Sequence, residues 1–275
     1  MDSGLYIVAT PIGNLGDMVP RAIETLQAVD LIAAEDTRHS APLLKHFAIE
    51  TPMIPYHDHS DERALARIAD CIDKGGAVAL ISDAGTPLIS DPGYRLLCHA
   101  HDRGWPVVPV PGASALTAAL SVAGLPTDRF RFEGFLPARA GARRTRLEAL
   151  SLEPVTMVFY EAPHRVEETL AAMEEVFGAQ RLAVLARELT KAFETVLRGS
   201  LGEVLGRVRS DSNQSRGEIV LLVAGAPSGD AVITPEIARL LERLAEMLPP
   251  RQAAAMVAEI FGLRKKALYQ HLIDR

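Results

Sequence analysis

The stretch AVALISDAGTPLISDPGYRLLCHAHDRGWPVVPVP, residues 77–111, contains a complete strand–helix–strand unit. An apolar run leads into a loop rich in Gly and Pro, a helical pattern follows from Tyr94, and a second apolar run closes the unit. Gly104 stands where the C-terminal cap of that helix belongs. Because strands that alternate with helices form a largely parallel sheet, this stretch predicts an α/β fold.

The same alternation extends along most of the chain. Before this unit, LYIVAT and LIAAED enclose the helical pattern RAIETLQAV. After it, VTMVFYE, RLAVLARE and EIVLLVAG indicate a second α/β block. We expect the strands at 193–198 and 218–223 to be neighbours, which would make the second sheet mixed. The Gly, Pro and Arg residues of 123–142 favour a linker or exposed loop.

A third change of composition occurs at 226–235, beyond which the pattern is helical throughout. Apolar positions from Ala255 to Leu272 resemble a helix-turn-helix, with Lys265 and Lys266 just after the turn. Such units commonly bind nucleic acid, but small helical hairpins that only pack are about as common. The chain thus divides into expected units at 1–122, 123–226 and 234–275.

The bulk composition limits the class of protein. The chain has 275 residues, 48% of them hydrophobic, and its two cysteines follow no metal or redox spacing. We read them as buried thiols of a reducing compartment. The N-terminus lacks the basic region of a signal peptide, and no stretch is long enough to cross a bilayer. We therefore expect a cytoplasmic protein with no membrane partner, and its histidines indicate no metal site.

The formal net charge of −6 does not indicate nucleic-acid binding. Two segments are nevertheless basic, at 129–146 and 251–275. Each could follow an RNA backbone or be an ordinary solvated face. Phe130, Phe132 and Phe135 interleave the first segment and could stack on bases, although core packing is the more common role for at least two of them.

Four loops follow expected strands, and open α/β sheets bind ligands at that edge. They are ATPIGNLGD (9–17), AEDTR (34–38), SDAGTPLISDPG (82–93) and VPGASAL (110–116). The third is the most informative, because Gly85 and Gly93 let backbone amides face a ligand while Asp83, Thr86 and Asp91 supply polar groups. No loop contains the Gly-Lys-Ser/Thr ending of a P-loop, which argues against phosphoryl transfer.

Together with EGFLP (133–137), FYEAPHR (159–165) and ARELTKAFE (186–194), these loops resemble those of the bacterial ribosomal RNA small subunit methyltransferase I family. That family belongs to the tetrapyrrole methylase superfamily, and the resemblance covers roughly the whole chain. It implies two α/β domains with a cofactor cleft between them, a small C-terminal helical domain and a homodimer. It also implies S-adenosylmethionine-dependent methylation of the ribose 2′-hydroxyl of a cytidine in the decoding region of small-subunit (16S) rRNA. We expect that RNA to be bound within the assembled subunit, although the sequence leaves free RNA open as the substrate.

The resemblance carries over to individual positions. The loops at 9–17 and 34–38 would face the substrate. The residues expected to hold S-adenosylmethionine are Pro11, Gly85, Thr86, Pro87, Ile89, Ser114, Ala115, Tyr160 and Ala186.

A ribose hydroxyl is weakly acidic, so methyl transfer needs a group that accepts its proton. The candidates are Glu35, Asp36, Glu161, His164, Glu188 and Lys191. We favour Lys191 with Glu188, three residues apart just after an expected strand, although a solvated ion pair would look the same. A helix-capping role for His164 is equally consistent with its position.

RNA affinity would come from phosphate contacts. The residues expected to make them are Arg38, Arg143, Arg144, Arg165, Lys265 and Lys266, and Arg187 is also suited to phosphate. Two alternatives stay open: a methylase of a small tetrapyrrole, and a non-catalytic RNA-binding assembly factor. The basic segments argue against the first, because a small ligand needs neither of them.

Overall fold

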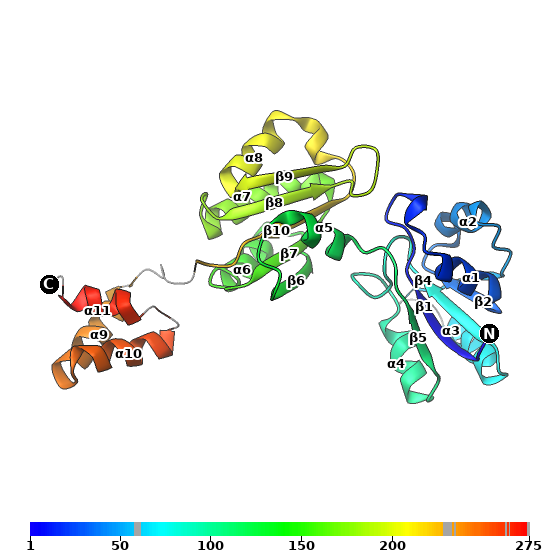
Figure 1. Cartoon of the computed structure of the whole chain (residues 1–275), viewed down its shortest axis with the longest axis horizontal. Coiled ribbons are helices and arrows are strands. Elements are labelled where there is room, and N and C mark those ends of the chain that lie inside the picture. Colours follow the sequence, from blue (N-terminus) through cyan, green and yellow to red (C-terminus); the bar gives the residue numbers. More distant parts are fainter. Residues whose placement is uncertain (58–61, 228–232, 234, 262, 264, 274–275) are drawn as a thin grey trace.

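A computed structural model gives the arrangement of the chain (Figure 1). It describes residues 1–57, 62–227, 233, 235–261, 263 and 265–273. Two sheets of five strands follow each other along the sequence, and three helices form a separate unit at the C-terminal end (Figure 1).

The first sheet has the order β3-β2-β4-β1-β5, and every pair in it is parallel. Its strands are β1 (Gly4–Val8), β2 (Leu31–Ala34), β3 (Met53–Pro55), β4 (Ala77–Ile81) and β5 (Val107–Val110). Its helices are α1 (Pro20–Ala28), α2 (Thr37–His46), α3 (Glu62–Asp73) and α4 (Tyr94–Asp102), with a 3₁₀ turn η1 (Leu15–Asp17) after β1. The predicted α/β fold is confirmed.

Helices cover both faces of this sheet. Leu26 of α1 and Leu44 of α2 pack on one face, whereas Ile68 of α3 and Leu96 of α4 pack on the other. The central strand β4 is buried at every position, as a strand between two helical layers must be. Gly104, at φ +68°, follows α4 in the left-handed conformation predicted for a C-terminal cap.

The second sheet has the order β6-β7-β10-β8-β9, in which β6 and β7 are parallel and the other pairs antiparallel. Its strands are β6 (Phe130–Phe135), β7 (Thr156–Glu161), β8 (Leu182–Arg187), β9 (Thr195–Ser200) and β10 (Ile219–Val223). Its helices are α6 (Ala140–Ala149), α7 (Val166–Phe177) and α8 (Leu201–Ser210), with 3₁₀ turns η2 (Pro163–Arg165) and η3 (Ser212–Ser215). The predicted mixed sheet is confirmed.

Helix α5 (Ala115–Ala123) joins the two domains. It begins directly after the loop that follows β5, yet its buried residues Ala119 and Leu120 pack on Val184 and Val220 of the second sheet. Helices α6, α7 and α8 cover the opposite face of that sheet. The chain of the first domain therefore contributes one layer of the second.

Two expectations about this region were wrong. β9 and β10 are not neighbours, because β8 lies between them and pairs with both. Residues 123–142 are not a linker, since they include edge strand β6 and the start of α6. The hydrophobic pattern of the sequence did not predict β6, because Phe130 and Phe135 are 43% and 56% exposed and a register shift occurs between Phe132 and Gly134. Core packing of at least two of the three phenylalanines is therefore also wrong: only Phe132 packs on a hydrophobic cluster.

The C-terminal unit consists of α9 (Pro235–Met247), α10 (Pro250–Phe261) and α11 (Lys265–Ile273). Its own small core includes Leu241, Ala254, Val257 and Leu268. In Figure 1 it lies at the far end of the molecule from the first sheet. Within the described part of the chain, no helix combines the length and apolarity that a bilayer crossing requires.

Candidate active site between the two domains

Three loops meet at the carboxyl edge of the first sheet. The main chains of Thr10 and Gly85 form a bridge, which ties the loop after β1 to the loop after β4. The hydroxyl of Thr86 donates to the carbonyl oxygen of Ala113 at 3.0 Å, which adds the loop after β5. These bonds hold one continuous surface at the position where a parallel sheet binds ligands.

The loop at 82–93 has an unusual backbone. Gly85 and Gly93 have φ values of +80° and +131°, and the non-glycine residues Leu88 and Ser90 have φ values of +74° and +70°. Left-handed conformations at such residues cost on the order of 1–3 kcal/mol each and concentrate at functional sites. A Cβ at Gly93 would lie 2.7 Å from Leu80 Cδ2, so no larger residue fits there.

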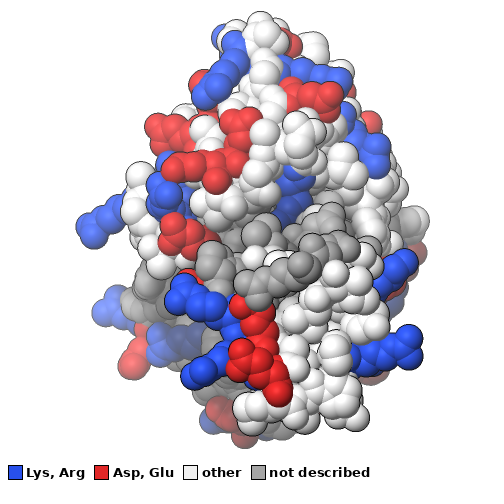
Figure 2. Space-filling model, turned by 90° about the vertical axis from the view of Figure 1, so that its left-hand side faces the viewer, with Lys and Arg blue, Asp and Glu red and all other residues white. Residues whose placement is uncertain are grey.

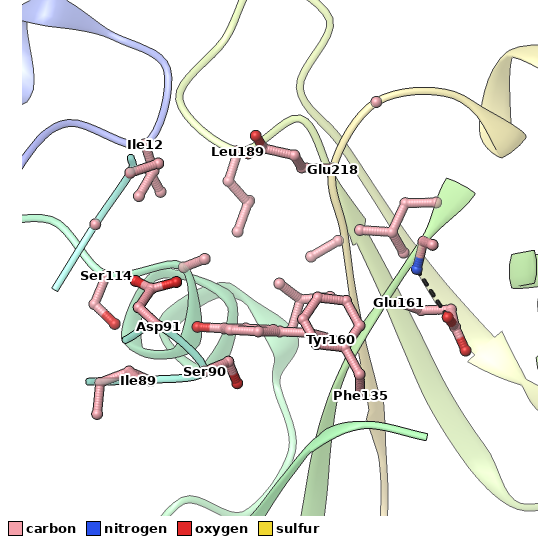
Figure 3. A pocket seen from close by; sticks show the side chains of 18 of the residues that line it. Ile12, Ile89, Ser90, Asp91, Ser114, Phe135, Tyr160, Glu161, Leu189 and Glu218 are labelled. Carbon is pink, nitrogen blue, oxygen red and sulfur yellow. Dashed lines mark hydrogen bonds between the residues drawn. The ribbon is translucent and has the colours of Figure 1, made fainter. Parts of the chain in front are cut away.

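This surface forms one wall of a cavity of about 370 Å³, whose other walls come from the second domain (Figure 3). The first domain supplies Ile12, Ala84, Gly85, Thr86, Ile89, Ser90, Asp91, Ser114 and Ala115. The second domain supplies Phe135, Tyr160, Glu161, Ala162, Pro163, Ala186, Leu189, Gly217, Glu218, Ile219 and Val220. The cavity is large enough for a small-molecule ligand.

The structure brings most of the expected cofactor residues together. Gly85, Thr86, Ile89, Ser114, Ala115, Tyr160 and Ala186 all line this cavity. The other two expected cofactor residues, Pro11 and Pro87, are buried and do not line it. The sequence did not single out the strand end at 217–220, because nothing in the apolar run of β10 distinguishes its first residues from core.

Tyr160 connects the two domains across the cavity. Its ring packs edge-on against Phe132 and Phe135, at centroid distances of 5.0 and 5.7 Å. Burial raises the pKa of its phenol, a hydrogen bond with the main chain of Leu116 opposes that rise, and the charge of Asp91 adds to it. Figure 3 shows the phenol oxygen pointing toward Asp91 and Ser114 of the first domain.

Acidic side chains gather beside the cavity. Burial raises the pKa of Asp91 to about 6, and the charges of Glu35 and Asp83 contribute to the rise. The pKa of Glu35 is also raised, again chiefly by burial, and its Oε2 accepts a hydrogen bond from the Asp83 amide at 3.3 Å. This side of the cavity therefore favours a ligand that carries positive charge.

Lys191 and Glu188 do converge, as their spacing predicted. The Lys191 ammonium lies 2.9 Å from Glu188 Oε1 and 3.1 Å from Glu218 Oε2. Partial burial disfavours the charged ammonium, but its hydrogen bonds to Glu188 and Glu218 raise the pKa of Lys191 overall. Glu188 also accepts from the Glu218 amide at 2.9 Å, and its pKa is lowered despite its burial. Of the three residues, only Glu218 lines the cavity.

The aliphatic part of Lys191 lies against Gly13 of the first domain, where a Cβ would overlap its carbon atoms. Glu188 and Thr190 have left-handed φ values of +51° and +67°. The turn at 188–191 therefore has a strained backbone and packs against the loop that follows β1.

Two of the other expected proton acceptors, Asp36 and Glu161, have structural partners. Asp36 caps α2 through the Arg38 amide, and its ion pair with Arg38 lowers its pKa strongly. Glu161 is 3% exposed and accepts hydrogen bonds from Thr169 Oγ1 at 2.6 Å and from the Ala162 amide. His164 is exposed in η2, whose N-cap residue is Ala162.

The residues expected to contact RNA differ in their exposure to solvent. Arg38, Arg144, Lys265 and Lys266 are exposed, although Arg144 pairs with Glu148 and Glu175. Arg143 is only 4% exposed and pairs with Glu168, and Arg187 is 7% exposed, so direct phosphate contacts by these two do not fit the structure.

Arg165 also has a structural role, because it donates to the carbonyl oxygens of Leu136 and Pro137.

The end of the molecule that carries α9–α11 has a surface of mixed charge. In Figure 2 the described basic and acidic side chains are intermixed on this face.

Comparison with known proteins agrees with this architecture. Residues 4–205 match the model of the Tetrapyrrole (Corrin/Porphyrin) Methylases, and residues 231–275 match that of the RsmI C-terminal HTH domain. A protein of Pseudomonas aeruginosa named ribosomal RNA small subunit methyltransferase I is 56% identical over 273 residues, covering 98% of this chain and 97% of its own.

The chain belongs to the ribosomal RNA small subunit methyltransferase I family, within the tetrapyrrole methylases.

Members of this family remain similar over the full length. The Escherichia coli O157:H7 protein of the same name is 48% identical over 271 residues, with coverage of 98% of this chain and 95% of its own. Among solved structures, a cobalt precorrin-4 methyltransferase superposes with a TM-score of 0.61 at 16% identity, covering 80% of this chain and 94% of its own. A diphthine synthase superposes with the same TM-score of 0.61 at 16% identity, covering 80% of this chain and 89% of its own. These structures share the two-domain fold with the family.

Proposed function

We propose that this chain transfers a methyl group from S-adenosylmethionine to the ribose 2′-hydroxyl of a cytidine in the decoding region of small-subunit ribosomal RNA. The observation that carries the proposal is the cavity between the two domains, in a chain 56% identical to a protein named ribosomal RNA small subunit methyltransferase I. We further propose that the enzyme is a cytoplasmic homodimer and that it acts on the assembled small subunit.

The residues of the cavity fit the cofactor. S-adenosylmethionine has a flat adenine, a sulfonium cation and an ammonium group. Small residues such as Gly85, Ser114 and Ala186 leave room for a flat ring against the backbone, and Tyr160 provides an aromatic surface. Asp91 and Glu218 add carboxylates for the positive groups. When bound, the cofactor supplies an electrophilic methyl group on a positively charged sulfur.

The protein has to orient the acceptor and to receive a proton. With the cofactor bound, the acceptor oxygen would take its methyl group in exchange for the bond to sulfur, and the hydroxyl proton would have to pass to a base or to water. Orientation contributes much of the rate when reacting atoms are held about 3–3.5 Å apart. Proton transfer to a positioned group typically contributes about 10²–10⁴-fold.

We propose that Glu188, Lys191 and Glu218 handle this proton. Because its two carboxylate partners keep Lys191 protonated at neutral pH, the acceptor within this group is a carboxylate. Glu218 is the member that faces the cavity. Lys191 then acts as a cation that positions the carboxylates, which refines the pairing of Lys191 with Glu188 expected from the sequence.

A methyl-transfer assay with three acceptors tests the proposal. The purified protein is supplied with labelled S-adenosylmethionine and with small ribosomal subunits from cells lacking the protein, with extracted small-subunit RNA, or with a tetrapyrrole. We expect label on the subunits, mapped to the 2′-oxygen of one cytidine. Transfer to the tetrapyrrole would favour the alternative methylase, and cofactor binding without any transfer would favour an assembly factor.

A further inference from the structure

A second cavity adjoins the first. It is a shallow depression that is wide open to solvent, has a volume of about 640 Å³, and lies between the loop after β1, the loop after β5 and helix α5. Ile12 and Ser114 line both cavities. A ligand in the second cavity would therefore lie beside a ligand in the first, with Ile12 and Ser114 at the boundary between them.

One face of α5 forms the long side of the second cavity. Ser114, Thr117, Ala118 and Ser121 are spaced at helical intervals and all line it. Their small side chains leave the backbone accessible to a flat molecule. The hydroxyls of Thr117 and Ser121 donate to the carbonyl oxygens of Ser114 and Ala118, so toward a ligand these oxygens can act only as acceptors.

Two polar groups of this cavity lack partners. Asp17 Oδ2 and Thr190 Oγ1 are inaccessible to solvent and have no hydrogen-bond partner among the described residues, and both residues line the cavity. Buried polar atoms without partners are rare in folded proteins and call for an explanation. Thr190 also has a left-handed φ of +67°, so the chain bears strain to place it there.

The polar groups that line the second cavity indicate the class of ligand that it would bind. The available groups are a carboxylate and hydroxyl oxygens, which accept hydrogen bonds from N–H and O–H groups. The described residues that line the cavity include no Lys or Arg, so the site is not built for phosphate. A nucleoside unit fits this pattern, because its ribose hydroxyls and an exocyclic amine are donors.

We infer that the second cavity binds the acceptor nucleoside, and that Asp17 and Thr190, whose unpartnered oxygens are enclosed in this structure, turn these oxygens toward its donor groups while the phosphates on either side stay outside. The inference rests on the proposed function. It adds a site for the sugar and base, and it makes Asp17 and Thr190 residues that determine acceptor specificity.

Kinetics of isosteric variants test this inference with the full-length protein. Asp17→Asn and Thr190→Val keep the shape of each side chain and remove an acceptor or a hydroxyl. For each we expect the KM for small subunits to rise, or kcat/KM to fall, at least tenfold, while the calorimetric affinity for S-adenosylmethionine stays within twofold of the parent. Asp70→Asn, which alters an exposed carboxylate beyond the cavity, is the matched control and should match the parent.

A blocking variant covers the case in which Asp17→Asn fails to fold. Ser121 is exposed on α5, so Ser121→Phe fills the cavity without disturbing the core, and methylation should fall while cofactor affinity is kept. Parental kinetics in all three variants would overturn the inference. So would a changed oligomeric state in sedimentation with parental kinetics, because a second copy of the chain would then be the occupant. The parent protein serves as the separate readout of the proposed function: if it methylates no subunits, that proposal fails and the inference falls with it.

Discussion

The main chains of Thr10 and Gly85 exchange two hydrogen bonds, from the Thr10 amide at 2.8 Å and from the Gly85 amide at 3.0 Å. This pair joins loops that are more than seventy residues apart in the sequence. It also fixes the one residue whose φ of +80° lets the loop after β4 follow the cavity wall.

Gly85→Ala is therefore expected to weaken cofactor binding at least tenfold. The new Cβ would lie 3.2 Å from Ile12 Cγ2 in a left-handed conformation, which costs roughly 1–2 kcal/mol. Calorimetry with S-adenosylmethionine measures the effect. Gly104→Ala is the matched control, because Gly104 also has a positive φ but nothing lies within 4 Å of its Cβ position. Both variants should melt a few degrees lower, and equal losses of affinity would contradict the prediction.

Asp91→Asn is expected to raise stability and to reduce cofactor affinity. The folded-state pKa of Asp91, about 6, lies above its ordinary value of 3.8, so the charged form destabilises the folded state at higher pH. After allowance for solvent screening of a half-exposed group, we expect a gain on the order of 1 kcal/mol at pH 8. The difference in melting temperature between variant and parent should vanish as pH falls from about 6 toward 4.

The affinity of the parent for S-adenosylmethionine should change with pH in the direction opposite to the change in its stability. This affinity should fall as pH drops through about 6, because protonation removes a negative charge from the wall of the cavity proposed to hold the cationic cofactor. The asparagine variant should bind weakly at every pH. A parent whose affinity does not change between pH 7.5 and 5 would rule out a charged contact at Asp91.

Lys191→Met is expected to lower kcat on the order of 10²-fold while cofactor affinity stays near that of the parent. Methionine keeps the packing on Gly13 and removes the cation that positions Glu188 and Glu218. The pH profile of kcat should shift as well, which a loss of packing alone would not cause. Lys191→Arg should recover part of the rate. Near-parental turnover of the methionine variant would remove this residue from the mechanism.

Lys265→Glu combined with Lys266→Glu is expected to weaken binding of small subunits and to reduce its salt dependence. Both lysines are exposed at the start of α11, and each lost phosphate contact lowers the salt slope by about one. Fluorescence titration at several salt concentrations measures the slope. Lys74→Glu, an exposed lysine paired with Asp70, is the control. Equal slopes for variant and parent would show that this unit does not contact RNA.

The sequence predicted the parts of the fold in which local pattern and burial agree. β4 is apolar and buried at all positions, and the glycines at 85, 93 and 104 do adopt positive φ values. Strand β6 was missed because an edge strand with exposed phenylalanines lacks the pattern of burial. The order of β8, β9 and β10 depends on long-range pairing, which no local pattern records.

The candidate site shows the same division. Loop residues such as Thr86 and Ser114 were predicted because their motifs carry a resemblance. Burial of Arg143 depends on how α6 packs against α7, so its basic neighbours in the sequence gave a misleading indication. Glu218 was missed because its role follows from the contact with Lys191, twenty-seven residues earlier in the chain.

Helix α5 starts at the rim of one sheet and packs on the other. Because α5 is packed on the second sheet, a change in the angle between the two domains would bend the chain in the loop before this helix and not within it. If the proposed cofactor is exchanged through such a movement, crosslinking the two domains across the mouth of the cavity should slow product release and leave the first turnover unchanged.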